Sequence, residues 1–263
     1  MFDYHKNKER YFNMQYLTAR DYILPFIQKS LSINPGMHVL EIGCAEAGVL
    51  KAFIEKDCIC TGLDLNESRI QLAKEFHREA LQLNKIRFST TNLYDLSYGV
   101  DFPVKFDVVV LKDVIEHIPD QLRFIKRIRE LINPGGWIFF AFPPWQMPFG
   151  GHQQMCRSSW MARLPWLHLL PSAVYRKILE MCGESPAVVD ELMEIKETGL
   201  SIAQFEQIAE ASGLEIVDKL FYLTNPIYKF KFGLKVRRVS PIFNYLPYFR
   251  NFYTTAAYYL MKN

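Results

Sequence analysis

One stretch decides the fold of this chain: Val39-Leu40-Glu41-Ile42-Gly43-Cys44-Ala45-Glu46-Ala47-Gly48. It begins as a short apolar strand, carries an acid, and passes through small residues into a helical pattern. A tight turn of small residues between a strand and a helix lets a ligand approach the backbone closely. The free N–H groups of the following helix then point at that ligand. The stretch therefore predicts a nucleotide-like cofactor at this turn, although a tight turn without a ligand would show the same pattern.

Apolar runs and helical patterns alternate on both sides of this turn. The runs predict five strands, at 37–42, 58–63, 86–91, 106–111 and 137–142. The helical patterns between them lie at 47–56, 67–83 and 120–131. A separate helical pattern at 11–31 precedes the first strand, and Pro25 is expected to kink or divide it. Strands that alternate with helices predict a parallel sheet with right-handed crossovers.

The alternation stops after residue 142. Residues 143–200 are rich in Pro, Trp, His and Met, and residues 225–250 are basic and aromatic, so we expect both segments to be insertions. The sheet resumes with a helix at 201–212, a strand at 214–221 and a last strand at 252–261.

Length and composition limit the class of protein. The 263 residues are enough for one large α/β domain with insertions, and a net charge of +3 is too small to argue for nucleic acid. The five cysteines are odd in number and show no CxxC spacing, which supports neither a disulfide framework nor a zinc knuckle. The first residues lack the apolar segment of a secretory signal, and no run approaches the roughly 18 apolar residues of a membrane span. We therefore expect a cytoplasmic protein.

Four motifs resemble those of the class I S-adenosylmethionine-dependent methyltransferases. In chain order they are the glycine-rich stretch from Glu41 to Gly48, Gly62-Leu63-Asp64, Phe106 to Leu111 followed by Asp113 to Asp120, and Leu131-Ile132-Asn133-Pro134-Gly135-Gly136. The resemblance is close over about 36–142 and looser beyond. It implies a doubly wound, Rossmann-like α/β sheet of seven strands in the order 3-2-1-4-5-7-6, with the last strand antiparallel. It also implies a helical lead-in at 1–35 and one methyltransferase domain at 36–263, whose insertions at 143–200 and 225–250 form a substrate cap.

One departure concerns the first motif, where Ala45 and Ala47 stand at positions that are usually Gly. A positive φ is costly for Ala. We expect Gly48 to supply the missing backbone freedom.

The resemblance implies S-adenosylmethionine as the cofactor and assigns its contacts. Glu41 would lie near the methionine part, with the backbone from Gly43 through Cys44 to Ala45 beneath the cofactor. Asp64 would hold the ribose hydroxyls beside Leu65, Asn92 and Leu93 would border the adenine, and Lys112 and Asp113 would line the methionine end.

Asp64 also stands out from spacing alone, because an acid 21 positions after Gly43 falls at the tip of the neighbouring strand. The alternative is that Asp64 caps the next helix, with Glu67 completing a capping box, and both interpretations can hold together.

Two histidines are candidates for the chemistry. Methyl transfer is an in-line displacement, and a base assists when the acceptor is a hydroxyl. His117 lies in Asp113-x-x-Glu116-His117, whose charged residues would share one face of a helix, and the alternative is that it only fixes the loop. This arrangement resembles the metal-binding or base-carrying loop of some O-methyltransferases, but we predict no metal. His152 follows Gly150-Gly151, which suits either a lid over the acceptor or a flexible surface turn.

The insertions bear on the acceptor. Aromatic side chains alternate with Arg157 and Arg163, and every charged side chain from Lys219 to the end is basic. An apolar or acidic acceptor, or one at a membrane surface, would suit this pattern, and so would a cap with its own core and a basic rim. RNA is not favoured, because no RNA-binding module is visible.

We therefore predict methyl transfer to a small or carrier-linked acceptor, with oxygen as the target atom. The resemblance points to sugars, polyketides or quinone-like rings. The alternatives are a non-catalytic binding protein of the same fold, an RNA methyltransferase, and an NAD-dependent dehydrogenase, for which Gly48 fits GxGxxG but Ala45 does not. We expect a monomer or homodimer.

Overall fold

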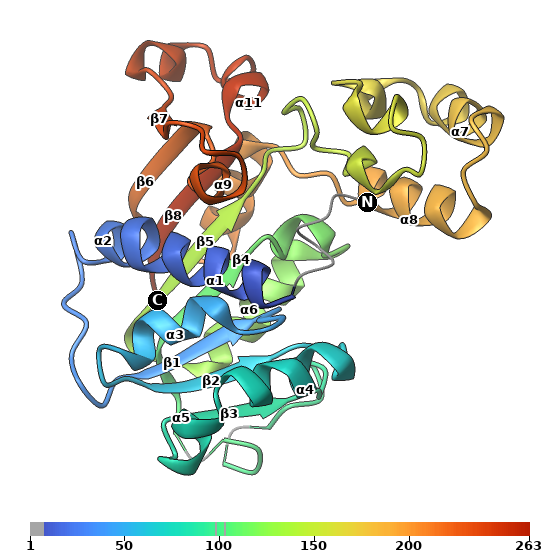
Figure 1. Ribbon diagram of the computed structural model, residues 1–263. Helices are drawn as coiled ribbons and strands as arrows, with labels where there is room; N and C mark the ends of the chain where they lie inside the picture. The colour runs from blue at the N-terminus through green and yellow to red at the C-terminus, as the bar shows by residue number, and fades with distance from the viewer. Residues whose placement is uncertain (1–7, 98, 103) are drawn as a thin grey trace.

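The computed structural model describes residues 8–97, 99–102 and 104–263, apart from the side chains of 244 and 245 (Figure 1). The first seven residues of the predicted lead-in, 1–35, lie outside the described residues.

The described residues form one eight-stranded sheet. Its strands are β1 (His38–Ile42), β2 (Ile59–Leu63), β3 (Ile86–Ser89), β4 (Phe106–Lys112), β5 (Ile132–Phe142), β6 (Glu215–Thr224), β7 (Arg237–Arg238) and β8 (Ala256–Lys262). Their order is β3-β2-β1-β4-β5-β8-β6-β7, and β8 runs antiparallel to both β5 and β6. The predicted order is confirmed, with β8 as the seventh strand of the prediction. The added two-residue strand β7 pairs with the outer edge of β6 and was missed because it lies in the second insertion.

Helices cover both faces of the sheet (Figure 1). They are α1 (Lys8–Thr18), α2 (Leu24–Ile27), α3 (Gly48–Ile54), α4 (Glu67–Phe76), α5 (Arg78–Gln82), α6 (Gln121–Leu131), α7 (Ser172–Met181), α8 (Pro186–Glu197), α9 (Ile202–Ala211), α10 (Ile227–Phe232) and α11 (Arg250–Tyr253). Within the described ranges, none is both long and apolar enough to cross a bilayer.

The central strand β4 shows why the sheet needs two helical layers. Val108 and Val110 pack into the core with α2 and α3, whereas Val109 and Leu111 pack into the core with α6 and α9. Successive side chains of a strand point to opposite faces, so an apolar run of this kind is buried on both sides.

Two predicted helices are interrupted. The leading helix breaks at a π-helical turn, Ala19–Ile23, upstream of Pro25, which lies in the first turn of α2, where a missing N–H is tolerated. The helix predicted at 67–83 divides at His77, whose buried ring bonds the carbonyl oxygen of Ala47 at 3.0 Å. A side chain turned into the core thus ends the regular helix.

Most strand bounds differ from the prediction by three residues or fewer, but β5 and β8 begin further from their predicted first residues. β5 begins at Ile132, and residues 133–136 bulge out of its pairing with β4, so the predicted turn lies inside the strand. β8 begins at Ala256 and not at 252, because α11 occupies the preceding residues. The Arg250 side chain holds α11 against α9 through an ion pair with Glu206 at 2.8 Å.

Residues 143–200 build a small core of their own around Tyr175, Leu179 and Leu192. His168 ties this segment together. Its Nε2 lies 2.7 Å from the carbonyl oxygen of Trp145, and Lys196 Nζ donates to the His168 carbonyl at 2.6 Å. A Cβ on Gly151 would overlap the His168 ring, so this glycine allows the close contact.

We expect the free energy of unfolding to fall as the pH drops from about 6.5 to about 4, partly because of His168. Burial lowers the pKa of His168 to about 4, and the charge of Lys196 lowers it further, while the Trp145 carbonyl opposes. The unfolded chain therefore takes up a proton first, and stability that is present above pH 6.5 is lost as the pH falls toward 4, by up to about 3 kcal/mol. Urea unfolding of the wild type and His168→Gln across this range measures the effect. The free energy of unfolding of the variant should depend less on pH than that of the wild type. Some dependence should remain, because the pKa of His152 is also about 4. Parallel pH profiles of the two proteins would contradict the role of His168.

Candidate active site

The turn after β1 is held in an unusual conformation. Gly43, Ala45 and Ala47 all have positive φ, at 69°, 50° and 60°. A Cβ on Gly43 would overlap Val114, so this glycine also brings the loop after β4 close to the turn. Gly48 has no positive φ; a Cβ there would overlap the carbonyl oxygen of Phe12 in α1. The expectation that Gly48 supplies backbone freedom was wrong, because its role is to let α1 approach.

We expect Ala45→Gly to raise the free energy of unfolding by about 0.5–1 kcal/mol, because it relieves the left-handed strain at a partly exposed residue. Ala47→Gly is the matched control: Ala47 is fully buried, so the lost methyl offsets the relief and the net change should be near zero. Chemical denaturation of the cofactor-free protein measures both. Destabilisation by Ala45→Gly would contradict the strain at this position.

Asp64 is turned toward this loop. Its Oδ2 accepts a hydrogen bond from the Ala45 backbone N–H at 2.8 Å, and its Oδ1 accepts one from the Asn66 N–H at 2.9 Å. Asn66, and not Asp64, caps α4, since its side chain accepts from the Arg69 N–H at 3.1 Å. The capping alternative was therefore wrong. The carboxylate fixes the turn at the mouth of the first two strands, and the neighbouring Leu65 side chain is exposed.

Two further predicted cofactor contacts, Glu41 and Cys44, lie in β1 and in the turn that follows it. Glu41 is buried, and burial raises its pKa well above the ordinary value, with Lys112 opposing and Asp64 adding to the rise. Its Oε2 has no hydrogen-bond partner among the described residues. Cys44 is buried against Gly62, and its N–H donates to the Leu63 carbonyl at 2.9 Å.

Asn92 is exposed in the loop after β3, whereas the neighbouring Leu93 is buried. The Asn92 side-chain oxygen accepts from the Tyr94 N–H at 3.1 Å, and the Leu93 side chain is buried in the core that contains α6. Arg127 of α6 donates to the Leu93 carbonyl at 3.1 Å and to the Leu96 carbonyl. The Arg127 hydrogen bonds therefore hold the loop after β3 against α6.

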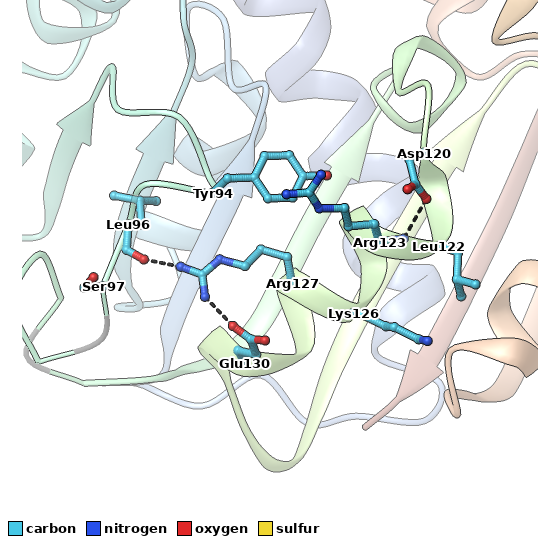
Figure 2. Close-up of a pocket in the computed structure, with 9 residues that line it drawn as sticks. All are labelled: Tyr94, Leu96, Ser97, Asp120, Leu122, Arg123, Lys126, Arg127 and Glu130. Atoms are coloured by element: carbon cyan, nitrogen blue, oxygen red, sulfur yellow. Dashed lines mark hydrogen bonds and ion pairs between the residues drawn. The ribbon is translucent and has the colours of Figure 1, made fainter.

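A groove of about 940 Å³ lies between this loop and α6 (Figure 2). Figure 2 shows Arg123 lying over the Tyr94 ring, 4.8 Å from its centre, and Arg127 bridging the Leu96 carbonyl and Glu130. No predicted site residue lines the groove. Asp64 and Asp113 do not line this groove.

Lys112, the last residue of β4, forms an ion pair with Asp113, which follows it. Burial, the largest influence, lowers the pKa of Lys112, but the charges of Asp113 and Tyr11 outweigh it and leave the pKa above its ordinary value. Asp113 has a φ of 56°, and its N–H donates to the Ala141 carbonyl at 2.8 Å. Asp113 therefore combines a strained backbone with the ion pair to Lys112.

Sequence reasoning missed Lys231 of α10. Burial lowers the pKa of Lys231 to about 8, with the charge of Lys112 lowering it further and Asp113 opposing. The second insertion thus brings a cation to the same ion pair. The basic character of residues 225–250 was the available signal, but the sequence does not tell which of its cations turns inward.

The two candidate histidines lie together, although they come from different loops. Their ring centres are 5.0 Å apart. His117 ends a single 3-10 turn, Ile115–His117, so the predicted shared helical face does not form. Burial lowers the pKa of His152 to about 4, with His117 adding to the effect, and burial also lowers the pKa of His117, with Asp113 opposing. Both imidazoles are therefore neutral at pH 7 and can accept a proton.

Glu116 completes this group. The side chain is buried, and neither carboxylate oxygen has a hydrogen-bond partner among the described residues. Burial raises its pKa well above the ordinary value, and Asp113 adds to the rise. One potential ligand atom each from Glu116, His117 and His152 lies within 4.8 Å of the others. A neutral acid hydrogen-bonding a ligand, or a carboxylate holding a cation, would satisfy these oxygens.

A family model described as a methyltransferase domain matches residues 13–184. The chain belongs to the methyltransferase domain family. This methyltransferase domain is 35% identical over 118 residues to a ubiquinone biosynthesis O-methyltransferase of Coxiella burnetii, over 45% of this chain and 48% of that protein. The protein of the same name from Leptothrix cholodnii is 26% identical over 118 residues, or 45% and 49% of the two chains. The chain thus spans about half the length of the curated relatives it matches.

Solved structures of low identity share the fold. Magnesium protoporphyrin IX methyltransferase from Synechocystis PCC 6803 with bound SAH superposes with a TM-score of 0.54 at 15% identity, over 95% of this chain and 84% of that one. Phosphoethanolamine N-methyltransferase 2 of Haemonchus contortus gives a TM-score of 0.56 at 15% identity, over 92% and 52%. The [4+2]-cyclase SpnF gives 0.55 at 13% identity, over 92% and 80%. The predicted Rossmann-like fold is confirmed, and the cyclase illustrates that this fold alone does not decide an activity.

Proposed function

We propose that this chain is an S-adenosylmethionine-dependent methyltransferase that methylates an oxygen of a small acceptor with a quinone-like ring. The observation that carries the proposal is the Asp64 carboxylate, held 2.8 Å from the Ala45 N–H at the mouth of β1 and β2. An acid at this place is suited to the two ribose hydroxyls of a nucleoside. Family membership supports the reaction type, and the names of the curated relatives support oxygen as the target and a quinone-like acceptor.

The crevice residues have separate proposed roles toward the cofactor. Glu41, with its unpartnered oxygen, faces the amino group of the methionine part, and the backbone from Gly43 through Cys44 to Ala45 lies beneath the cofactor. Asp64 accepts from the ribose, and the exposed Leu65 side chain covers the adenine side. Of the two residues first assigned to the adenine, Asn92 stays a candidate, whereas the buried Leu93 contributes at most its backbone.

The residues after β4 and β5 are proposed to serve the acceptor. When bound, the cofactor supplies a methyl group that already carries a good leaving group, so alignment and exclusion of water provide much of the rate. The neutral His152 accepts the proton from the acceptor hydroxyl as its oxygen bonds to the methyl carbon and the carbon–sulfur bond breaks. The His117 ring, 5.0 Å from that of His152, positions it, and Glu116 lies beside the pair. Lys112 and Asp113 line the methionine end of the cofactor, with Lys231 near their ion pair.

A second way to activate the oxygen is open to the same side chains. The three ligand atoms within 4.8 Å and the two unpartnered oxygens of Glu116 favour a divalent cation, which would polarise the acceptor oxygen when bound. Dialysis against EDTA separates the two proposals. An unchanged turnover supports His152 as the base without a metal, and a loss that Mg²⁺ restores supports the cation.

Incubation with methyl-labelled S-adenosylmethionine tests the proposed reaction. Catechol serves as a probe for a hydroxylated ring, and glucose serves as a sugar control. We expect label in the methyl ether of catechol, with an equal amount of S-adenosylhomocysteine formed. A chain that binds the cofactor but labels neither probe would favour the non-catalytic alternative.

We propose that residues 36–263 act as one methyltransferase domain, with 143–200 and 225–250 as a cap over the acceptor. A small-molecule acceptor agrees with the names of the relatives. A cytoplasmic location, a monomer or homodimer, and the absence of a nucleic-acid partner stay predictions.

A further inference from the structure

We propose that residues 237–253, the aromatic tip, dock on the surface of an anionic lipid membrane. The aromatic tip comprises β7, the 3-10 turn Pro241–Tyr245 and α11. The inference goes beyond the proposed function, and it requires no step of the proposed reaction.

Large apolar side chains gather on the aromatic tip. Tyr248 is 63% exposed and Phe249 is 54% exposed, and Ile242, Leu246 and Tyr253 are exposed as well. The Tyr248 ring lies 5.6 Å from that of Phe249 and 5.5 Å from that of Phe252. Exposed apolar residues are usually scattered singly on a soluble protein, whereas a contiguous cluster indicates a contact surface.

Hydrogen bonds attach the inner side of the aromatic tip to α9, and this fixes which of its side chains face outward. Arg250, Asn251 and Thr254 are buried. Arg250 Nη2 donates to Glu206 of α9 at 2.8 Å, and the Asn251 side-chain oxygen accepts from the Ile202 N–H at 2.8 Å. These bonds turn the polar side chains inward and leave the aromatic ones outside.

The charged side chains that the aromatic tip itself contributes are all basic. The sequence has no Asp or Glu after Asp218, and Lys235, Arg237 and Arg238 are exposed beside the cluster. Lys219 and Arg250, in contrast, pair with Glu206. Aromatic side chains prefer the headgroup region of a bilayer, and lysine and arginine are attracted to anionic headgroups. This combination fits an anionic lipid surface, because the rings can enter the headgroup layer while the cations remain above it.

The same insertion connects the aromatic tip to the candidate active site. Figure 1 shows β7 and α11 at the top of the view, the end of the molecule where the cap helices α7 and α8 also lie. α10, in the same connection between β6 and β8, carries Lys231, whose pKa responds to Lys112 and Asp113. Docking of the aromatic tip would therefore bring a segment that reaches the Lys112–Asp113 ion pair close to the lipid, which suits an acceptor with an apolar tail.

Vesicle flotation tests the inference. We expect the wild type to float with vesicles of equimolar phosphatidylcholine and phosphatidylglycerol and to stay behind with phosphatidylcholine alone. The Arg237→Gln, Arg238→Gln double variant should bind the anionic vesicles about thirtyfold more weakly. Each basic residue near the surface contributes roughly 1 kcal/mol, and each 1.4 kcal/mol changes the affinity about tenfold. The Tyr248→Ser, Phe249→Ser double variant should lose about tenfold or more.

Leu83→Ser is the matched control, because Leu83 is 59% exposed but follows α5, beside the opposite edge of the sheet. It should float like the wild type. Equal flotation of all variants, or no flotation of the wild type, would overturn the inference. A second result would also overturn it: a wild-type protein that is dimeric and a Tyr248→Ser, Phe249→Ser variant that is monomeric. That result would show that the aromatic tip binds a second copy of the chain. Titration with S-adenosylmethionine in solution is independent of vesicles, so the proposed function can survive the failure of this inference.

Discussion

Asp64→Ala should weaken S-adenosylmethionine binding about 5- to 150-fold, or about 1–3 kcal/mol, the largest effect that we expect on affinity. The Asp64 carboxylate has two roles. It accepts from the Ala45 and Asn66 N–H groups, which fixes the turn, and its remaining lone pairs are proposed to accept from the ribose. The substitution removes both at once. Isothermal titration calorimetry measures the change.

Two control variants separate the tasks of Asp64. Asp64→Asn keeps one acceptor oxygen and should lose less affinity than Asp64→Ala. Asn66→Ala removes the cap of α4, so it should cost about 1 kcal/mol of stability but leave the affinity nearly unchanged. An Asp64→Ala protein that binds the cofactor like the wild type would show the ribose assignment to be wrong.

His152→Ala should lower kcat by about 10²–10⁴-fold without changing the affinity for the cofactor. Its imidazole is neutral at pH 7 and lies beside His117, so it can accept the acceptor proton. Steady-state kinetics with the acceptor identified in the labelling experiment, together with calorimetry, measures the two quantities.

The histidine pair provides the control for this prediction. If His117 acts through His152, the His117→Ala, His152→Ala double variant should be no slower than His152→Ala, because residues that act as a unit are not additive. An unchanged kcat in His152→Ala would remove this residue from the chemistry. Fully additive losses would assign His117 a separate role.

Most of the sheet could be predicted from the sequence, because burial leaves a strong pattern. Val108 to Leu111 form an unbroken apolar run since both faces of β4 are covered. The interruptions could not be predicted, because each depends on a contact distant in sequence. His77 ends α4 by bonding the Ala47 carbonyl, and α11 forms in place of a strand start because Arg250 reaches Glu206.

The residues of the candidate site could be predicted from the sequence, but much of their arrangement in space could not. Asp64, His117 and His152 could each be named from sequence, since an acid or imidazole after a strand is a local signal. The positive φ of Ala45 and Ala47 could not, because alanine prefers negative φ in isolation. The approach of Lys231 and the unpartnered oxygens of Glu116 arise only when separate loops pack together.

We expect S-adenosylmethionine to bind at the turn after β1, beside Asp64 at the end of β2. Calorimetric titration of the wild type with S-adenosylmethionine and, separately, with NAD measures this binding. S-adenosylmethionine should bind saturably, with one site per chain, and NAD should give no comparable heat. Tight binding of NAD alone, or of neither compound, would rule out this site.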